Sequence, residues 1–347
     1  PRAPDPAAPS MARRGMKAWV ARRYGPPEIL RLTELPDPAP GPGEVLVRVR
    51  AIGLNFADCA ARLGVYPRVP RTPFVPGMEV SGEIVAHGEG VTSPEAGARV
   101  AAVPIFGGHA ELVAVKVGSV RVLPEAISFV EGAALAVTGL TADHALFTVG
   151  RLRAGERVLI NAGAGGVGTM AVQMASRAGA RVVAVASTEA KRELAGSLGA
   201  AETFGYERYR EAVADGVDVV LDSVGGRVFR PAWNALRPDG RYVLFGFAAA
   251  IGARRVRYPR AAFEFLRMGA VLPAAMVQSC RTLAGFNLSL VPHLAAELQQ
   301  RFARLEAMLA AGEVRPVIGA VFPFARLPEA HALLQGRGST GKVVVEA

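Results

Sequence analysis

One segment constrains the fold more than any other: a short apolar strand that runs directly into a glycine-rich turn and then into a helix. The strand is residues 157–160, and residues 161–168 after it read Asn-Ala-Gly-Ala-Gly-Gly-Val-Gly. Without Cβ atoms such a turn tightens and lets backbone N–H groups at the helix N-terminus face an anion. Glycine-rich turns that are purely structural also occur, but the strand before and the helix after favour dinucleotide binding. The predicted contacts are Gly163, Gly165, Gly166, Val167 and Gly168.

The end of the next strand, residues 181–186, indicates which dinucleotide is bound. An acidic residue about 20 positions beyond the loop would hold the ribose 2′-hydroxyl of NAD. Ser187 and Thr188 stand there instead, followed by Lys191. Hydroxyl donors and a cation suit a 2′-phosphate, so we predict NADP(H) with Ser187, Thr188 and Lys191 as ligands. The alternative is that Ser187 only caps a helix.

The chain divides into two regions with different hydrophobic periods. Residues 44–50 alternate polar and apolar side chains, as a half-buried antiparallel strand does, and other short glycine-punctuated runs follow up to about residue 118. These predict a small domain of β-barrel type. From residue 128 long helical segments, including one over 129–148, alternate with short apolar strands, which predicts a parallel sheet.

The last elements do not continue that alternation. A helix near 294–311 ends before Gly312, and strands at 317–322 and 342–345 flank a short helix. We expect them to complete the first domain, with the coenzyme domain inserted into it. The predicted boundaries are a leader at 1–15, a catalytic domain at 16–136 plus 302–347, and a coenzyme-binding domain at 137–301.

Composition excludes several classes. A length of 347 residues exceeds the roughly 250–300 at which one core stops growing. Two cysteines do not make a disulfide framework, so we expect a reducing compartment, the cytoplasm, and no segment has the roughly 20 apolar residues of a membrane span. Residues 1–15 lack the apolar core of a signal peptide, and we expect them to be disordered. The net charge of +10 is spread over scattered arginines apart from the cluster at 254–257, so nucleic acid is not an expected partner.

Four motifs in order resemble those of the medium-chain dehydrogenase/reductase superfamily, and more narrowly its zinc-independent quinone oxidoreductase branch. They are Asn-Phe-Ala-Asp at 55–58, Gly-Met-Glu-Val-Ser-Gly at 77–82, Thr-Gly-Leu-Thr-Ala at 138–142, and the loop ending at Gly168. The resemblance covers residues 16–347. It implies an α/β protein with a GroES-like β-barrel catalytic domain, an inserted Rossmann coenzyme-binding domain, and an active site in the cleft between them.

Metal ligands of the alcohol dehydrogenase branch are missing. That branch has a zinc-binding Cys near the segment that here holds Asn55, and a zinc-binding His where this chain has Met78. No cysteine lies between Cys59 and Cys280, so the four-cysteine lobe of that branch is absent as well. Zinc needs three or four N, S or O ligands, and we predict no metal site.

The resemblance implies hydride transfer to an activated acceptor, a quinone or an α,β-unsaturated carbonyl, whose developing oxygen charge needs only hydrogen-bond donors. Asn55 is then expected at the nicotinamide and Tyr66 at the acceptor oxygen; Tyr66 packing beside Pro67 is the alternative. Asp58 is expected to pair with Arg62, with a role as general base less favoured. The remaining predicted cofactor contacts are Thr138, Tyr206, Ser223, Phe245, Gly246, Phe247, Asn287 and Lys342.

The resemblance also implies a homodimer, with residues 241–247 as the sheet edge at which the two copies meet. Two other functions stay open at this point. One is a reductase of another enoyl or carbonyl substrate on the same fold. The other is a binding or structural protein that retains the NADPH site.

Overall fold

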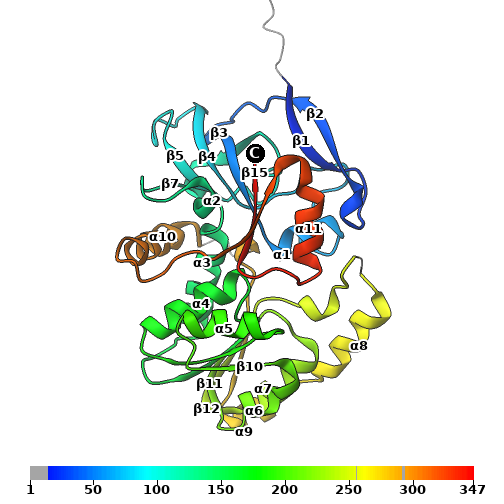
Figure 1. The fold of residues 1–347 in the computed structure, drawn as a ribbon, viewed down its shortest axis with the longest axis vertical. Helices are drawn as coiled ribbons and strands as arrows, with labels where there is room; N and C mark the ends of the chain where they lie inside the picture. Colours follow the sequence, from blue (N-terminus) through cyan, green and yellow to red (C-terminus); the bar gives the residue numbers. More distant parts are fainter. Residues whose placement is uncertain (1–14, 255, 291–293) are drawn as a thin grey trace, which may run out of the picture.

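A computed structural model describes residues 15–254, 256–290 and 294–347, and shows two domains built on two separate large sheets (Figure 1). The predicted leader therefore lies outside the described residues except for Gly15, which begins a strand. Arg255 of the 254–257 cluster also lies outside them. None of the described helices is long and apolar enough to cross a bilayer.

The catalytic domain contains a seven-stranded sheet in the order β14-β15-β3-β4-β5-β7, with β6 also paired to β3. The last strand, β15, lies antiparallel to β3, with Val343 opposite Leu54. The C-terminal strands thus complete the first domain, as predicted. The bounds are β3 Glu44–Leu54, β4 Val80–His87, β5 Arg99–Ala102, β6 Leu112–Lys116, β7 Val120–Val122, β14 Ile318–Pro323 and β15 Lys342–Glu346; a separate hairpin pairs β1 Gly15–Ala21 with β2 Leu30–Pro36.

The coenzyme domain is a six-stranded parallel sheet in the order β10-β9-β8-β11-β12-β13. The chain order reverses between β8 and β11, and in open parallel sheets ligands bind beyond the carboxyl ends of the strands at that point. The glycine loop follows β8, so it lies at this switch point. The bounds are β8 Arg157–Asn161, β9 Arg181–Val185, β10 Glu202–Phe204, β11 Val217–Asp222, β12 Leu236–Leu244 and β13 Thr282–Gly285.

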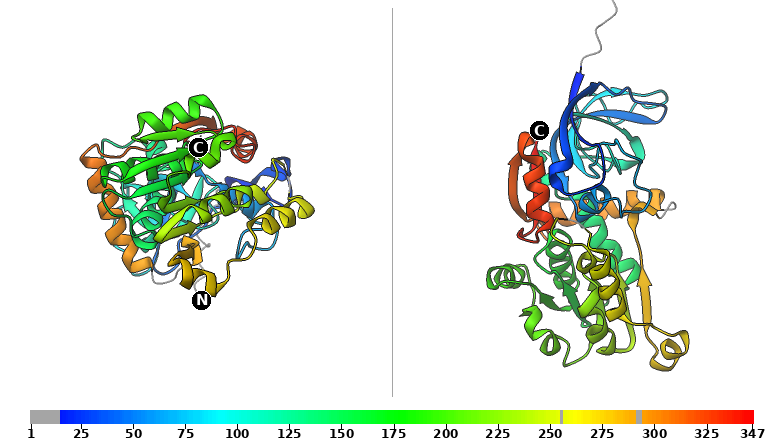
Figure 2. Two further views of the ribbon diagram at one scale, coloured as in Figure 1. Left: turned by 90° about the horizontal axis from the view of Figure 1, so that it is seen from below. Right: turned by 90° about the vertical axis from the view of Figure 1, so that its right-hand side faces the viewer.

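Alternate residues of these strands pack into two cores, one on each sheet face. Ile160 and Val182 contact the core that includes helices α3, α4 and α10, while Leu159 and Val183 contact the core that includes α6 and α7. The two layers of helices are visible in Figure 2. The bounds are α1 Phe56–Arg62, α2 Phe129–Gly132, α3 Ala136–Asp143, α4 Gly166–Arg177, α5 Glu189–Ser197, α6 Tyr209–Ala212, α7 Phe229–Asn234, α8 Tyr258–Met268, α9 Pro273–Ser279, α10 Leu294–Ala310 and α11 Leu327–Gln335.

Two predictions about these elements are wrong. The single helix expected over 129–148 is divided into α2, α3 and a π-helical turn over His144–Val149. The expected dimer edge at 241–247 is not an edge, because β12 is hydrogen-bonded on one side to β11 and on the other to β13. The predicted domain boundary at 136/137 falls after the first residue of α3, and the one at 301/302 falls inside α10. Both boundaries stay a prediction.

Two histidines from distant parts of the chain are packed against each other inside the catalytic domain. The rings of His109 and His331 are perpendicular with centroids 5.1 Å apart, and both side chains are fully buried. Burial, helped by the charge of Arg62, lowers the pKa of His109 to about 3, and burial also lowers the pKa of His331 well below its usual value. Both imidazoles are therefore neutral in the folded protein.

This pair predicts a pH dependence of stability. The unfolded chain protonates each histidine below about pH 6.5 while the folded protein does not, so each lowers stability by about 1.4 kcal/mol per pH unit as the pH falls below that value. Asp58 opposes this trend, because burial raises its pKa to about 7 and the folded protein keeps a proton that the unfolded chain loses. In denaturation series between pH 6 and pH 4.5, His331→Asn should make the slope shallower by about 1.4 kcal/mol per pH unit. An unchanged slope would show that His331 is protonated in the folded protein.

Candidate functional site

The glycine loop has the geometry of an anion site. Helix α4 begins at Gly166 after Gly165, and no side chain caps its first N–H groups. The tightness of the turn requires glycine at position 168, where a Cβ would lie 2.2 Å from the Ala162 carbonyl oxygen. A helix N-terminus with free N–H groups attracts phosphate. The residues present therefore fit a dinucleotide pyrophosphate.

The C-terminal strand of the catalytic domain docks on this loop. Gly341 N–H donates to the Ala164 carbonyl at 2.7 Å, and Gly341 forms an isolated parallel bridge with Gly165. Gly341 has a φ of +52°, and a Cβ there would lie 2.2 Å from the Val317 carbonyl oxygen. A Cβ at Gly166 would lie 3.1 Å from Thr138 Cγ2 and 3.6 Å from Lys342 Cδ. Thr138 and Lys342, two of the predicted cofactor contacts, thus adjoin the loop.

A buried ion pair lies directly behind the loop. Lys342 Nζ is 2.5 Å from Glu79 Oε2 and 2.6 Å from Asn55 Oδ1, and at most 8% of each of these three residues is exposed. The other Glu79 oxygen accepts from Val137 N–H at 2.7 Å, in the first turn of α3. Glu79 therefore links α3, β15 and the Asn55 segment.

The ammonium of Lys342 also defines the orientation of the Asn55 amide. An ammonium only donates hydrogen bonds, so the Asn55 atom facing it is the oxygen. Asn55 Nδ2 then donates to Glu79 Oε2 at 3.0 Å and to the Gly53 carbonyl at 3.2 Å. Both amide hydrogens are engaged inside the protein, which favours a positioning role for Asn55 over donation to a substrate.

Asp58 binds the backbone of Asn55. Its Oδ2 accepts from Asn55 N–H at 2.8 Å, and the Asp58 side chain is fully buried. The expected Asp58–Arg62 ion pair is wrong. The Arg62 guanidinium is also fully buried, and it donates to the Gly25 carbonyl and to Gln335 Oε1.

The Tyr66 hydroxyl bridges the two domains. It donates to Asn287 Oδ1 at 3.1 Å and lies 2.9 Å from Ser289 Oγ, while Ser289 Oγ donates to the same Asn287 oxygen at 2.8 Å. The Tyr66 ring contacts Phe106 edge-on, with centroids 6.5 Å apart. The structure thus brings together Tyr66 and Asn287, both predicted site residues, and adds Ser289.

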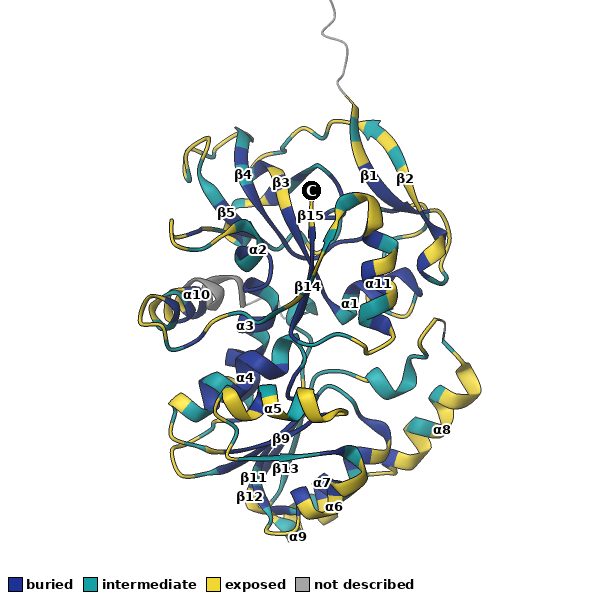
Figure 3. Cartoon of the chain, in the orientation of Figure 1, coloured by how far each residue is buried: buried dark blue, intermediate teal, exposed yellow. Residues whose placement is uncertain are grey.

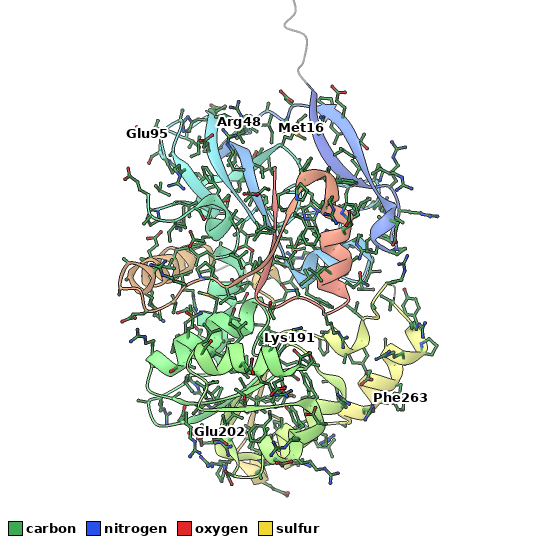
Figure 4. The ribbon with its side chains drawn as sticks, in the orientation of Figure 1. Met16, Arg48, Glu95, Lys191, Glu202 and Phe263 are labelled. Carbon is green, nitrogen blue, oxygen red and sulfur yellow. The ribbon has the colours of Figure 1, made fainter. Side chains whose placement is uncertain are left out.

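Cations gather at the far end of the loop. Lys191, labelled in Figure 4 on the side of the coenzyme domain that faces the catalytic domain, donates from Nζ to the Arg337 carbonyl at 2.8 Å. Partial desolvation lowers the pKa of Lys191. Desolvation and the neighbouring charge of Arg260 lower the pKa of Arg337, which also interacts with Tyr206. Ser187 is exposed beside this cluster, and Thr188, not Ser187, caps α5.

Tyr206 anchors the beginning of the loop. Its hydroxyl accepts from Ala162 N–H at 3.2 Å, and the Arg227 guanidinium lies 5.7 Å from the centre of its ring. Burial raises the pKa of Tyr206 to about 12, so the hydroxyl keeps its proton at neutral pH. That proton remains available for a ligand, because the Ala162 bond uses only the oxygen of the hydroxyl.

The other predicted contacts lie at the carboxyl ends of β11 and β12. Gly246 packs against Ser223, whose carbonyl oxygen would be 2.8 Å from a Cβ at position 246. Phe245 stacks on Phe286 with centroids 5.8 Å apart. Phe247 is 45% exposed and contacts Phe265 of α8, with centroids 5.3 Å apart, which places it at the edge of this region.

Sequence reasoning missed three residues of this site. Glu79 belongs to one of the four motifs, but the motif alone assigns it no role. The one sign that could have singled it out is its position directly before β4. Ser289 and Arg337 carried no local signal, because their partners lie 223 and 146 residues away. In the described part of the chain no three His, Cys, Asp or Glu side chains are grouped so that they would hold a metal ion.

Comparison with known proteins identifies relatives over nearly the whole chain. Residues 41–146 match the alcohol dehydrogenase GroES-like domain and residues 166–266 match the zinc-binding dehydrogenase family. The human synaptic vesicle membrane protein VAT-1 homolog is 33% identical, over 95% of this chain and 86% of its own length. The Sus scrofa quinone oxidoreductase is 31% identical, over 95% of this chain and 97% of its own length. The crystal structure of the Thermus thermophilus quinone oxidoreductase, also solved in complex with NADPH, is 39% identical with a TM-score of 0.79, over 96% of this chain and 100% of that one.

Proposed function

We propose that this chain, which belongs to the quinone oxidoreductase branch of the medium-chain dehydrogenase/reductase superfamily, reduces a quinone or an α,β-unsaturated carbonyl with NADPH. Family membership makes it an NADP(H)-dependent oxidoreductase. The choice of acceptor is the proposal. The observation that carries it is the Tyr66 hydroxyl, which crosses the domain interface to Asn287 and Ser289.

The residues that would hold the cofactor follow from the site. The N–H groups at Gly166, Val167 and Gly168 would bind the pyrophosphate, with Gly163 and Gly165 shaping the turn. Thr138 and Lys342, which border the loop at Gly166, would contact the nicotinamide end of the cofactor. At the other end Ser187, Lys191 and Arg337, near Tyr206, would hold the 2′-phosphate.

Bound NADPH supplies the hydride, and the protein supplies orientation and charge stabilisation. When an activated carbonyl accepts a hydride, negative charge develops on its oxygen. The Tyr66 hydroxyl donates a hydrogen bond to that oxygen while Ser289 Oγ–H turns to the tyrosine oxygen. Glu79, Lys342 and Asp58 hold Asn55 and the loop in place, so that the two reacting groups meet in one geometry.

The test is oxidation of NADPH, followed by absorbance, with benzoquinone, phenanthrenequinone, an alkenal and an alkenone as acceptors. Turnover with a quinone or with an enone supports the proposal and ranks the two classes. Tight NADPH binding without turnover on any of the four contradicts it and favours a binding protein that retains the coenzyme site.

Lys191→Ala should reverse much of the preference for NADPH over NADH. A hydrogen bond to a charged phosphate contributes about 1.5–3 kcal/mol, so the KM for NADPH should rise roughly 10- to 100-fold while the KM for NADH stays unchanged. Steady-state kinetics with both cofactors measure this. Lys116→Ala, which removes a surface lysine of the catalytic domain paired with Glu44, is the matched control. An equal rise for both cofactors would place Lys191 away from the 2′-phosphate.

We also propose that the protein is a homodimer, now through β13. That strand is an outer strand of the coenzyme sheet and is paired on one side only, with β12. An unpaired edge offers backbone donors and acceptors to a second copy. Light scattering that gives a mass near the 36.3 kDa of one chain would contradict the dimer.

A further inference from the structure

One segment of the coenzyme domain crosses to the catalytic domain and is held there by side chains. It comprises residues 248–254, between β12 and α8, and we call it the strap. Its first two N–H groups donate to the carbonyls of Ser223 and Val224 at 3.1 and 2.8 Å, which anchors it to the end of β11. At its other end Arg254 pairs with Glu28 of the catalytic domain at 2.7 Å. Figure 3 shows most of the strap half-buried, below α11.

The side chain of Gln335, the last residue of α11, connects the strap to α1. Its Nε2 donates to the Gly252 carbonyl of the strap at 2.7 Å, and its Oε1 accepts from the guanidinium of Arg62, the last residue of α1. Gln335 is 1% exposed and Arg62 is fully buried. Asn55 is the N-cap of the same helix, and the segment that leads to Tyr66 follows it. A buried series of hydrogen bonds therefore runs from the strap to the helix between these two residues.

Arg337 holds the same strap from a position two residues further along the chain. Its Nη2 donates to the carbonyls of Ala248 and Ile251, the second at 3.2 Å. Arg337 has a φ of +61°, a left-handed conformation that favours glycine, and yet the two glycines of this turn stand at positions 336 and 338. An arginine in this conformation indicates that its side chain has a role that outweighs the backbone strain.

The other side of Arg337 borders the place that we propose for the 2′-phosphate. The Arg337 carbonyl accepts from Lys191 Nζ at 2.8 Å. Both hydrogen bonds to the strap leave from Nη2, and a guanidinium presents five donors in a planar fork. Its remaining donors can therefore bind a phosphate while the bonds to the strap persist. One arginine can hold the strap and the phosphate together.

We propose that Gln335 and Arg337 are positioning residues, through which the strap transmits the binding of the coenzyme 2′-phosphate to the acceptor side of the site. The phosphate holds Arg337, Arg337 holds the strap, and Gln335 fixes α1 against it. Asn55 and Tyr66 then meet the nicotinamide in one geometry, and a small displacement of reacting groups costs much of the rate. The phosphate thus raises kcat as well as affinity. This inference rests on the proposed function, which places the phosphate beside Arg337.

The variant Gln335→Glu separates the two hydrogen bonds of Gln335. A carboxylate still accepts from Arg62, so the buried guanidinium keeps a partner and thermal melting should not fall. It has no donor for the Gly252 carbonyl, and two acceptors then face each other. With a saturating quinone or enone, the wild-type kcat should be about tenfold higher with NADPH than with NADH. Gln335→Glu should lower the kcat with NADPH about tenfold, and should change the kcat with NADH and the KM for NADPH less than about threefold.

Gln173→Glu is the matched control. Gln173 Nε2 also donates to backbone carbonyls, those of Thr169 and Arg315, and its Oε1 accepts from Arg315 N–H at 3.0 Å. This variant should keep the ratio of the two kcat values. Arg337→Lys, which keeps the charge but lacks the fork, should lose that ratio as Gln335→Glu does. Equal kcat values with both coenzymes in the wild type, or equal losses with both in Gln335→Glu, would overturn the proposal.

Trypsin cleavage after Arg254 reports on the strap without any turnover. Saturating NADPH should slow the cleavage of the wild type at least about fivefold more than saturating NADH does, because the phosphate suppresses local opening. This difference should disappear in Gln335→Glu. If no acceptor is reduced with either coenzyme, the proposed function fails, and the cleavage rates alone decide the role of the strap. Equal protection by NADPH and NADH would contradict that role.

Discussion

Replacing Glu79 with glutamine is expected to lower the free energy of unfolding by about 3 kcal/mol, because it leaves the buried ammonium of Lys342 without its counter-charge. The pair is 2.5 Å apart, with Glu79 fully buried and Lys342 3% exposed. Urea denaturation followed by tryptophan fluorescence measures the loss. Trp19 lies in the catalytic domain and Trp233 in the coenzyme domain, so a Trp233→Phe background reports on the domain that holds the pair.

The control is Glu83→Gln on β4, the strand that begins directly after Glu79. Glu83 pairs with Arg50 at 2.8 Å, but both side chains are substantially exposed, and such pairs contribute at most about 1 kcal/mol. In addition, Glu79→Gln combined with Lys342→Met should recover part of the lost stability, since no buried charge remains. If the double variant is no more stable than Glu79→Gln alone, the loss does not come from the unpaired ammonium.

The same network explains why Glu79 should matter for activity as well as for stability. Its two oxygens hold Lys342 and Asn55 on one side and the first turn of α3 on the other. Residue Thr138 of that turn adjoins the glycine loop at Gly166. Loss of the carboxylate therefore loosens the loop and the Asn55 segment together.

Local patterns predicted most of the fold. The strand at 181–185 and the glycine loop before α4 have local causes: an apolar run with β-branched residues, and glycines that a tight turn requires. The two-domain arrangement was predicted because the hydrophobic period changes where one domain gives way to the other. The resemblance to a family added the expectation that the active site lies between the two domains.

What the sequence could not show are contacts between residues far apart along the chain. Glu79 and Lys342 are 263 residues apart, and Arg62 finds its amide partner Gln335 273 residues away. Asp58 was the nearer candidate for Arg62, but α1 directs the Asp58 carboxylate to Asn55 N–H instead. Similarly, β12 lies inside its sheet because β13 pairs with it. No sequence pattern predicted β13, which is a strand of only four residues.

Replacing Tyr66 with phenylalanine is expected to lower kcat by about 100-fold or more, while the KM for NADPH stays the same. Removal of one preorganised donor from a developing oxyanion costs about 10²–10³ in kcat. The hydrogen bond is worth most when charge develops on the acceptor oxygen, so the loss appears in kcat and not in ground-state binding. Saturation kinetics on the best quinone or enone acceptor measure it.

Two further variants decide whether the hydroxyl itself is responsible. Tyr24→Phe removes another tyrosine hydroxyl of the catalytic domain, one that donates to the Pro70 carbonyl at 3.0 Å, and should leave kcat unchanged. Ser289→Ala keeps the donor but removes the group that turns toward it, so we expect a smaller loss, about tenfold. If Tyr66→Phe keeps kcat while Ser289→Ala lowers it, the serine hydroxyl is the donor and Tyr66 only positions it. If neither changes kcat, the acceptor oxygen is stabilised elsewhere in the site.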